Sequence, residues 1–300
     1  MPQGLLQCAS VLSLFAMDWA LALACGLLLA GEWKRRHAGA SAHLELSLPG
    51  MPPVAAVIVV ALCAHFYLLA ATMIENASFA SVFAAVPGVA LTHAGSVTLW
   101  ALFAACLLLA ANFLFGACVA VRSLCISALL ATILLLHAAM GHAAGRGDFT
   151  LHELLQFLHL AGMALWSGSV LVAGLFVAPQ MFAATSRIDP DYLRALSRVS
   201  AWSVALAVVT GAIRGWTGLD AHLGNLAQSG WGRILTLKLL FVCAALALGY
   251  MHRRDLRARG DDWTTAQCKR LLATLRIEAT CLTVVLLLSA WLASADLPGG

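Results

Sequence analysis

Long, uninterrupted runs of apolar residues constrain the fold of this chain more than any other feature of its sequence. Each run is about 20 residues long, which is the length of a helix that crosses a hydrocarbon core of about 30 Å. Every backbone N–H and C=O inside a bilayer needs a partner within the protein, so only helices or closed barrels can span it. Barrel strands would alternate apolar and polar residues over about ten positions, whereas these runs are continuous. The sequence therefore predicts an all-α bundle of transmembrane helices.

The composition excludes a soluble domain. Charged residues make up 11% of the chain and apolar residues 62%, whereas a soluble domain carries about 25% charged residues. A chain this apolar has too little polar surface to remain dissolved in water. We expect a membrane protein without enzymatic activity, because no part of the chain resembles a soluble catalytic domain.

Eight spans are expected, with proline, glycine or charged residues between them. Residues 89–141 form one apolar stretch that is long enough for two of these spans and too long for one. Pro179 is expected to close the fifth span, and Asp189 with Pro190 to begin the sixth. We treat residues 1–136 as an N-terminal four-helix half and residues 137–300 as a C-terminal half of one membrane domain. The expected spans are 8–31, 54–74, 89–110, 121–141, 151–178, 189–213, 231–251 and 266–293.

The distribution of Lys and Arg predicts the orientation of the bundle. Cytoplasmic connections of membrane proteins carry an excess of these residues. Fourteen of the 18 lie in or beside the odd-numbered connections, and four lie on the other side. This bias predicts that both termini are outside the cytoplasm. The net charge of +4 then reflects topology and does not indicate a nucleic-acid surface.

Histidines concentrate in the half of the bundle that is predicted to face outward. His93, His137 and His159 belong to three different spans, and a rise of 1.5 Å per residue puts each roughly 7–12 Å below the outer surface. Polar side chains inside a bilayer are costly and mark functional sites. A single intramembrane histidine can instead serve as a hydrogen-bonding link between helices.

The fifth expected span carries a polar and sulfur-containing stripe. His152, Gln156, His159, Met163 and Trp166 lie within about 60° of one another at 100° per residue. Imidazole binds both copper oxidation states, and thioethers favour Cu(I). Copper is expected to meet three of the candidate ligands at the mouth (His142, His152, His222) and then to occupy the layer below. The candidate copper ligands are His93, His137, Met140, His142, His152, His159, Met163 and His222.

Asp18, Lys238 and Glu278 are charged residues that lie inside the expected spans. A charge in the membrane needs a partner or access to water. Lys238 is expected to pair with Asp18 if the first and seventh spans touch. Glu278 is expected to pair near Arg276 or with a cytoplasmic arginine. A role of these charges in transport is the alternative.

Several short elements of the C-terminal half occur in a characteristic order. They are Gly141-His142-Ala143, Leu158-His159-Leu160 followed by Trp166-Ser167-Gly168, Leu196-Ser197-Arg198-Val199-Ser200 followed by Thr210-Gly211, Gly230-Trp231-Gly232-Arg233 with Lys238, and Glu278. In these residues the chain resembles the copper resistance protein D (CopD) family of bacterial inner-membrane proteins, most strongly over 137–298. The resemblance implies copper as cargo, movement across the inner membrane, most often by uptake, and a periplasmic copper-binding partner of the CopC kind.

Two other functions are consistent with the same histidines. Pairs on neighbouring helices, either His65 with His137 or His93 with His159, could ligate a b-type haem in a redox protein. A scaffold whose histidines only join helices would bind no metal. The sequence favours copper transport or copper handling and leaves haem b as the alternative.

Overall fold

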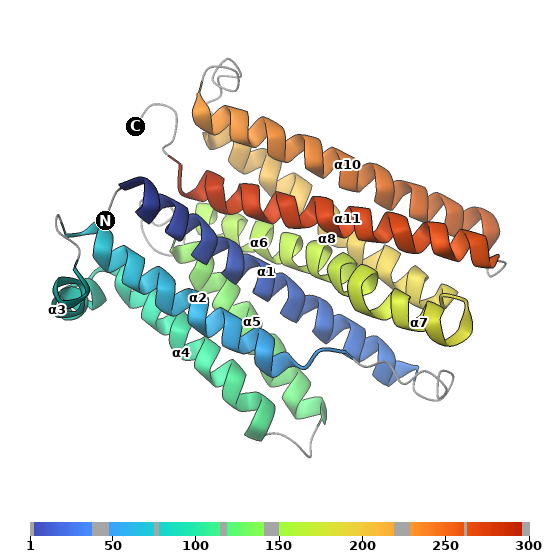
Figure 1. Ribbon diagram of the computed structural model, residues 1–300, viewed down its shortest axis with the longest axis horizontal. Coiled ribbons are helices and arrows are strands. Elements are labelled where there is room, and N and C mark those ends of the chain that lie inside the picture. The colour runs from blue at the N-terminus through green and yellow to red at the C-terminus, as the bar shows by residue number, and fades with distance from the viewer. Residues whose placement is uncertain are drawn as a thin grey trace.

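The protein is a bundle of long helices that run roughly along one direction (Figure 1). The computed structural model describes residues 3–37, 48–74, 78–114, 119–140, 150–218, 229–260 and 263–295. Every regular element within these ranges is helical, and eight helices are long and apolar enough to cross a membrane. The predicted all-α class and the number of spans are therefore confirmed.

The helices follow one another along the chain with short connections. In order they are α1 (Gln3–Arg36), α2 (Met51–Thr72), α3 (Phe79–Ala90), α4 (His93–Leu114), α5 (Val119–Ala139), α6 (Leu151–Val172), the π-helical turn η2 (Ala173–Val177), α7 (Ala178–Thr185), α8 (Pro190–Gly218), α10 (Gly230–Arg259) and α11 (Thr265–Ala293).

Side-chain caps fix where several helices begin. Thr150 and Glu153 form a capping box at the start of α6, in which each side chain bonds the other residue's backbone N–H. Asp189 accepts a 2.7 Å hydrogen bond from the backbone N–H of Asp191 and so caps α8, as its sequence predicted. Such caps satisfy N–H groups that have no partner inside the helix.

The third expected span begins later than predicted. Pro87 lies inside the short helix α3, which ends at Ala90. The spanning helix α4 begins at His93, after Thr92, whose hydroxyl accepts a 3.1 Å hydrogen bond from the N–H of Gly95. This local side-chain hydrogen bond lies at the start of α4, which hydropathy alone does not locate.

The prediction that Pro179 closes the fifth span is wrong. The π-turn η2 lies directly before Pro179, and in it the N–H of Ala178 bonds the carbonyl of Ala173, five residues earlier. This wider turn lets the proline, which has no N–H, occupy the first turn of α7 without ending the helical path. The helix ends at Ser186, whose φ of 56° is left-handed.

A close crossing of α1 and α6 joins the two halves of the chain. A Cβ atom on Gly168 would lie 1.8 Å from the Ala22 carbonyl oxygen, and one on Gly26 would lie 2.0 Å from the Gly168 carbonyl oxygen. Only glycine permits such contact between helix backbones, which is a common way of packing helices in membranes. The main apolar core accordingly draws residues from both 1–136 and 137–300.

Both ends of the described chain lie at the same end of the bundle (Figure 1). There the Gln7 side-chain amide donates a 3.5 Å hydrogen bond to the Ser294 carbonyl, which connects the start of α1 to the end of α11. We call this the terminal end. Its location in the periplasm stays a prediction from the Lys and Arg distribution.

Candidate functional site

A cavity of about 1210 Å³ opens among the helices at the terminal end. Residues from α1, α2, α6, α8, α10 and α11 and from the end of α5 line it. We call it the terminal cavity. Its polar, titratable and sulfur-containing lining includes Asp18, His65, His137, Met140, Gln156, His159, Met163, Arg214 and Lys238.

A histidine and a carboxylate on different helices are paired in the terminal cavity. His137 Nε2 lies 2.8 Å from Asp18 Oδ1, and their side chains are 11% and 14% exposed. The carboxylate accepts, so Nε2 carries a proton, and in the neutral ring Nδ1 then has a free lone pair. His137 Nδ1 is buried and has no hydrogen-bond partner. A carboxylate that orients a histidine through its second nitrogen is a common arrangement around protein-bound metals.

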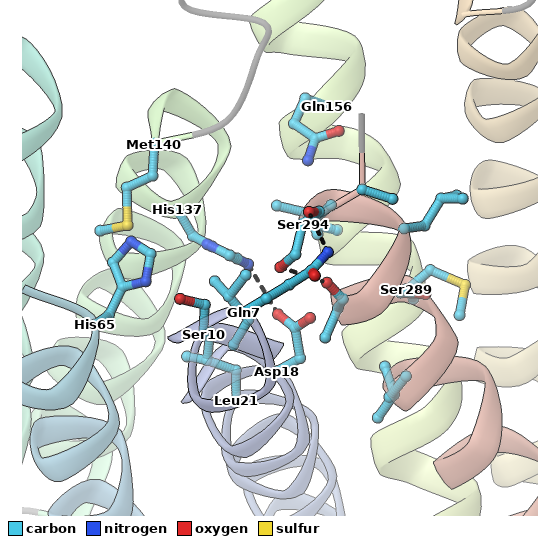
Figure 2. A pocket seen from close by; sticks show the side chains of 18 of the residues that line it. Gln7, Ser10, Asp18, Leu21, His65, His137, Met140, Gln156, Ser289 and Ser294 are labelled. Atoms are coloured by element: carbon cyan, nitrogen blue, oxygen red, sulfur yellow. Dashed lines mark hydrogen bonds and ion pairs between the residues drawn. The ribbon is translucent and has the colours of Figure 1, made fainter. Parts of the chain in front are cut away.

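A second imidazole and a thioether lie next to this pair. Figure 2 shows the Met140 sulfur directed toward the ring of His65, with His137 between that ring and Asp18. The rings of His65 and His137 both line the terminal cavity. His65 Nδ1, like His137 Nδ1, is buried without a partner. Two orphaned imidazole nitrogens beside a thioether form a donor set suited to Cu(I).

His159 lies in another part of the lining and is held firmly. Its Nδ1 lies 3.0 Å from the Ala207 carbonyl oxygen and 3.3 Å from Thr210 Oγ1. A carbonyl only accepts, so Nδ1 carries the proton and Nε2 keeps its lone pair. Gly211 makes room for the ring, because a Cβ atom there would lie 2.9 Å from His159 Cε1.

Four of the predicted ligands line the terminal cavity: His137, His159, Met140 and Met163. They do not converge on one point. Within the ranges that the structure describes, no three His, Cys, Asp or Glu side chains come close enough to hold one metal ion.

None of the other four predicted ligands is among the described residues that line the terminal cavity. His93 is exposed at the first residue of α4, and His152 is half-buried in the first turn of α6. Neither lines the terminal cavity. The predicted layer of His93, His137 and His159 is therefore not one cluster. His142 and His222 lie outside the described residues.

His65 is a cavity residue that sequence reasoning did not include among the copper ligands. The expected second span ended at residue 74, which placed His65 near the middle of the membrane. In the structure α2 ends at Thr72. His65 is seven residues before that end, or about 10 Å along the helix. That depth is within the range predicted for His93, His137 and His159. Measuring depth from the true end of α2 would therefore have included His65 in the same layer.

The buried charges have partners that the sequence did not predict. The close partner of Asp18 is His137, while Lys238 lines the same cavity. Glu278, only 4% exposed, lies 3.2 Å from Nδ1 of His252. The expected arginine partner is wrong, because α10 continues to Arg259 and keeps His252 within the bundle and not in a solvated connection.

A comparison with protein families identifies part of the chain. Residues 190–292 match the family model of copper resistance protein D. The match covers α8, α10 and nearly all of α11, about one third of the 300 residues. It confirms the resemblance to CopD over this segment. No curated protein and no solved structure matches the chain.

The CopD-like segment supplies one part of the terminal cavity and the rest of the chain supplies another. Arg214 and Lys238 lie within the matched residues, whereas His65, His137 and Met140 lie before them. The chain is thus a multi-pass helical membrane protein in which a segment that matches the model of a copper resistance family completes a cavity containing histidine and methionine.

Proposed function

We propose that this protein binds copper in the terminal cavity and carries it across the bacterial inner membrane by uptake from the periplasm. The observation that carries the proposal is the group formed by His65, His137 and Met140. Two buried nitrogens without partners lie beside a thioether, in a chain whose C-terminal segment matches a copper resistance family.

The donor set accounts for the choice of metal. Cu(I) accepts few ligands and binds both imidazole and thioether, whereas zinc more often recruits carboxylates or thiolates. Asp18 holds His137 through Nε2 and leaves Nδ1 for the metal. His159 and Met163, farther along the lining, offer a second pair of the same donor types for a copper ion on its way inward.

The proposed direction rests on the predicted orientation of the bundle, and the proposed partner rests on the resemblance to CopD. The Lys and Arg distribution favours a periplasmic terminal end, which would put the cavity on the side where copper arrives. We propose that a periplasmic copper-binding protein of the CopC kind delivers the ion there. Cells that express the wild-type protein should accumulate more copper than cells that express His137→Ala. Less copper in the wild-type cells than in the variant cells would contradict uptake.

Metal analysis of purified protein tests the site itself. The wild-type chain, loaded with copper and dialysed, should retain copper. Both His65→Ala and His137→Ala remove a proposed ligand and should lower the copper affinity by more than the roughly 10- to 100-fold that loss of an outer-shell partner costs. His93→Ala is the matched control, because it removes an exposed imidazole outside the cavity. Unchanged copper binding in both cavity variants would refute the site.

A visible spectrum of the same preparation distinguishes copper from haem. His65 and His137 are also a pair that the sequence named as possible haem ligands. A colourless protein that retains copper supports the proposal, whereas a strong Soret band that disappears in His137→Ala would replace it with a haem b protein.

A further inference from the structure

A second cavity extends toward the other end of the bundle. It measures about 280 Å³, and its described lining includes Trp166 of α6, Ser200 of α8, His252 of α10 and Glu278 of α11. The lining follows the first half of α8, the last half of α10 and the first half of α11. In Figure 1, α7 and the start of α11 lie at the end of the bundle away from both termini. We call this the second cavity.

Apolar side chains separate the second cavity from the terminal cavity. On α6, Met163 lines the terminal cavity and Trp166, three residues later, lines the second cavity. On α11, Leu286 lines the terminal cavity and Glu278 lines the second cavity, about 12 Å away along the helix. Leu282 lies between these two residues and is fully buried in the same apolar cluster as Met163 and Trp166. One apolar layer is therefore shared by the walls of both cavities.

His252 and Glu278 hold one proton between them. The Thr274 hydroxyl donates to the backbone carbonyls of Arg270 and Leu271, each at 3.0 Å. Toward His252 Nε2, which is 2.8 Å away, this hydroxyl can only accept, so Nε2 carries a proton. His252 Nδ1 lies 3.2 Å from Glu278 Oε2. A neutral Nδ1 and an ionised carboxylate are both acceptors and would repel each other. The pair therefore carries one further proton, either as an imidazolium or as a carboxylic acid.

The surroundings isolate this pair from other charges. The Glu278 side chain is 4% exposed and that of His252 is 18% exposed. Within the described lining, α6 and α8 contribute no acidic or basic residue, and α10 contributes Tyr250 and Arg253. The short elements η2 and α7 contain no charged residue, and α1, which also packs against α11, contains none from 19 to 31. The remaining ionisable neighbours along α11 are Arg276 and Cys281.

We propose that this protein is a symporter in which a proton held by Glu278 and His252 enters the cell together with copper. Carboxylate and histidine side chains inside a membrane are typical of proton relays. The proton site shares no residue with the copper group His65, His137 and Met140, so both sites can be occupied at once. Simultaneous occupancy suits symport, whereas exchange would suit one site for which the two ions compete.

The direction of the proton follows the predicted orientation of the bundle. The second cavity faces the predicted cytoplasmic end, so the pair releases its proton to water there. A proton from the periplasmic side replaces it when the apolar layer opens, and the chain returns to its starting charge. The inference rests on the proposed function and adds the ion that drives it.

Proteoliposomes that contain the full-length protein and a trapped pH-sensitive dye test this inference. The two sides start at equal pH, potassium and valinomycin clamp the membrane potential, and Cu(I) is added outside. In the wild type, copper entry should acidify the interior beyond the level in protein-free liposomes. In Glu278→Gln the acidification should fall at least tenfold, because an amide has no carboxyl proton to release. Its N–H can still donate to His252 Nδ1, and unchanged copper retention in metal analysis shows that the variant is folded. Glu32→Gln is the matched control, since Glu32 pairs with Arg35 and Arg36 outside the described lining of both cavities.

The outcomes separate this inference from the proposed function. Wild-type protein that takes up copper without acidifying the interior would overturn the inference and leave the proposed function standing. Equal acidification by the wild type and Glu278→Gln would also overturn it, because the proton would then travel by another route. An interior that becomes more alkaline would replace symport with exchange. Wild-type protein through which no copper enters would overturn both proposals.

Discussion

The crossing of α1 and α6 predicts a large effect from adding a single methyl group. In Gly168→Ala the new Cβ would lie 1.8 Å from the Ala22 carbonyl oxygen and 2.7 Å from its carbon. An ordinary carbon–oxygen contact is about 3.3 Å, so the two backbones must separate by roughly 1.5 Å (3.3 minus 1.8). Neither contacting atom belongs to a side chain that could rotate away. We expect a loss of about 3 kcal/mol, at the upper end of the range for overpacked cores.

An apparent melting temperature measured in detergent gives the readout. A loss of about 3 kcal/mol corresponds to a decrease of roughly 6–12 °C in a chain of this size. Gly31→Ala is the matched control in α1, because no atom lies within 4 Å of its new Cβ. That control should be neutral or slightly stabilising, since alanine favours helix over glycine by about 1 kcal/mol. Equal melting temperatures for the two variants would show that α1 and α6 do not cross at these glycines.

Two further predictions concern histidines held by neighbouring residues. In Gly211→Ala the new Cβ would lie 2.9 Å from Cε1 of His159, so the ring should move away from its carbonyl partner at a cost of about 1–2 kcal/mol. Thermal unfolding should show this loss of stability relative to the control variant Gly215→Ala. Equal stability of the two variants would contradict the packing of His159 against Gly211. Glu278→Ala should cost about 2 kcal/mol by leaving His252 Nδ1 without its 3.2 Å partner, whereas Glu278→Gln should cost less; equal losses in the two variants would show that the bond contributes nothing.

Hydropathy and helix signals were sufficient to predict most of the fold. Continuous apolar runs fix the number of spans because a bilayer admits few alternatives, and Asp189 begins α8 as its type predicts. Pro179 was misinterpreted because its effect depends on a π-turn in the preceding residues. No local pattern in the sequence specifies that turn.

The candidate site was less predictable because it depends on which helices are neighbours. The sequence placed His137 and His159 at a similar depth, and both line one cavity. It could not show that α2 brings His65 beside His137, or that Asp18 would bond this histidine in place of Lys238. Depth along a helix can be counted from sequence, whereas the direction in which a side chain faces depends on tertiary packing.

X-ray absorption at the copper edge of Cu(I)-loaded protein tests the central claim most directly. Two imidazole nitrogens and one thioether sulfur should surround the metal, and Met140→Leu should remove the sulfur signal while the nitrogen signal remains. A copper ion with no sulfur neighbour in the wild-type protein, or a sulfur signal unchanged by Met140→Leu, would contradict the assignment of copper to His65, His137 and Met140.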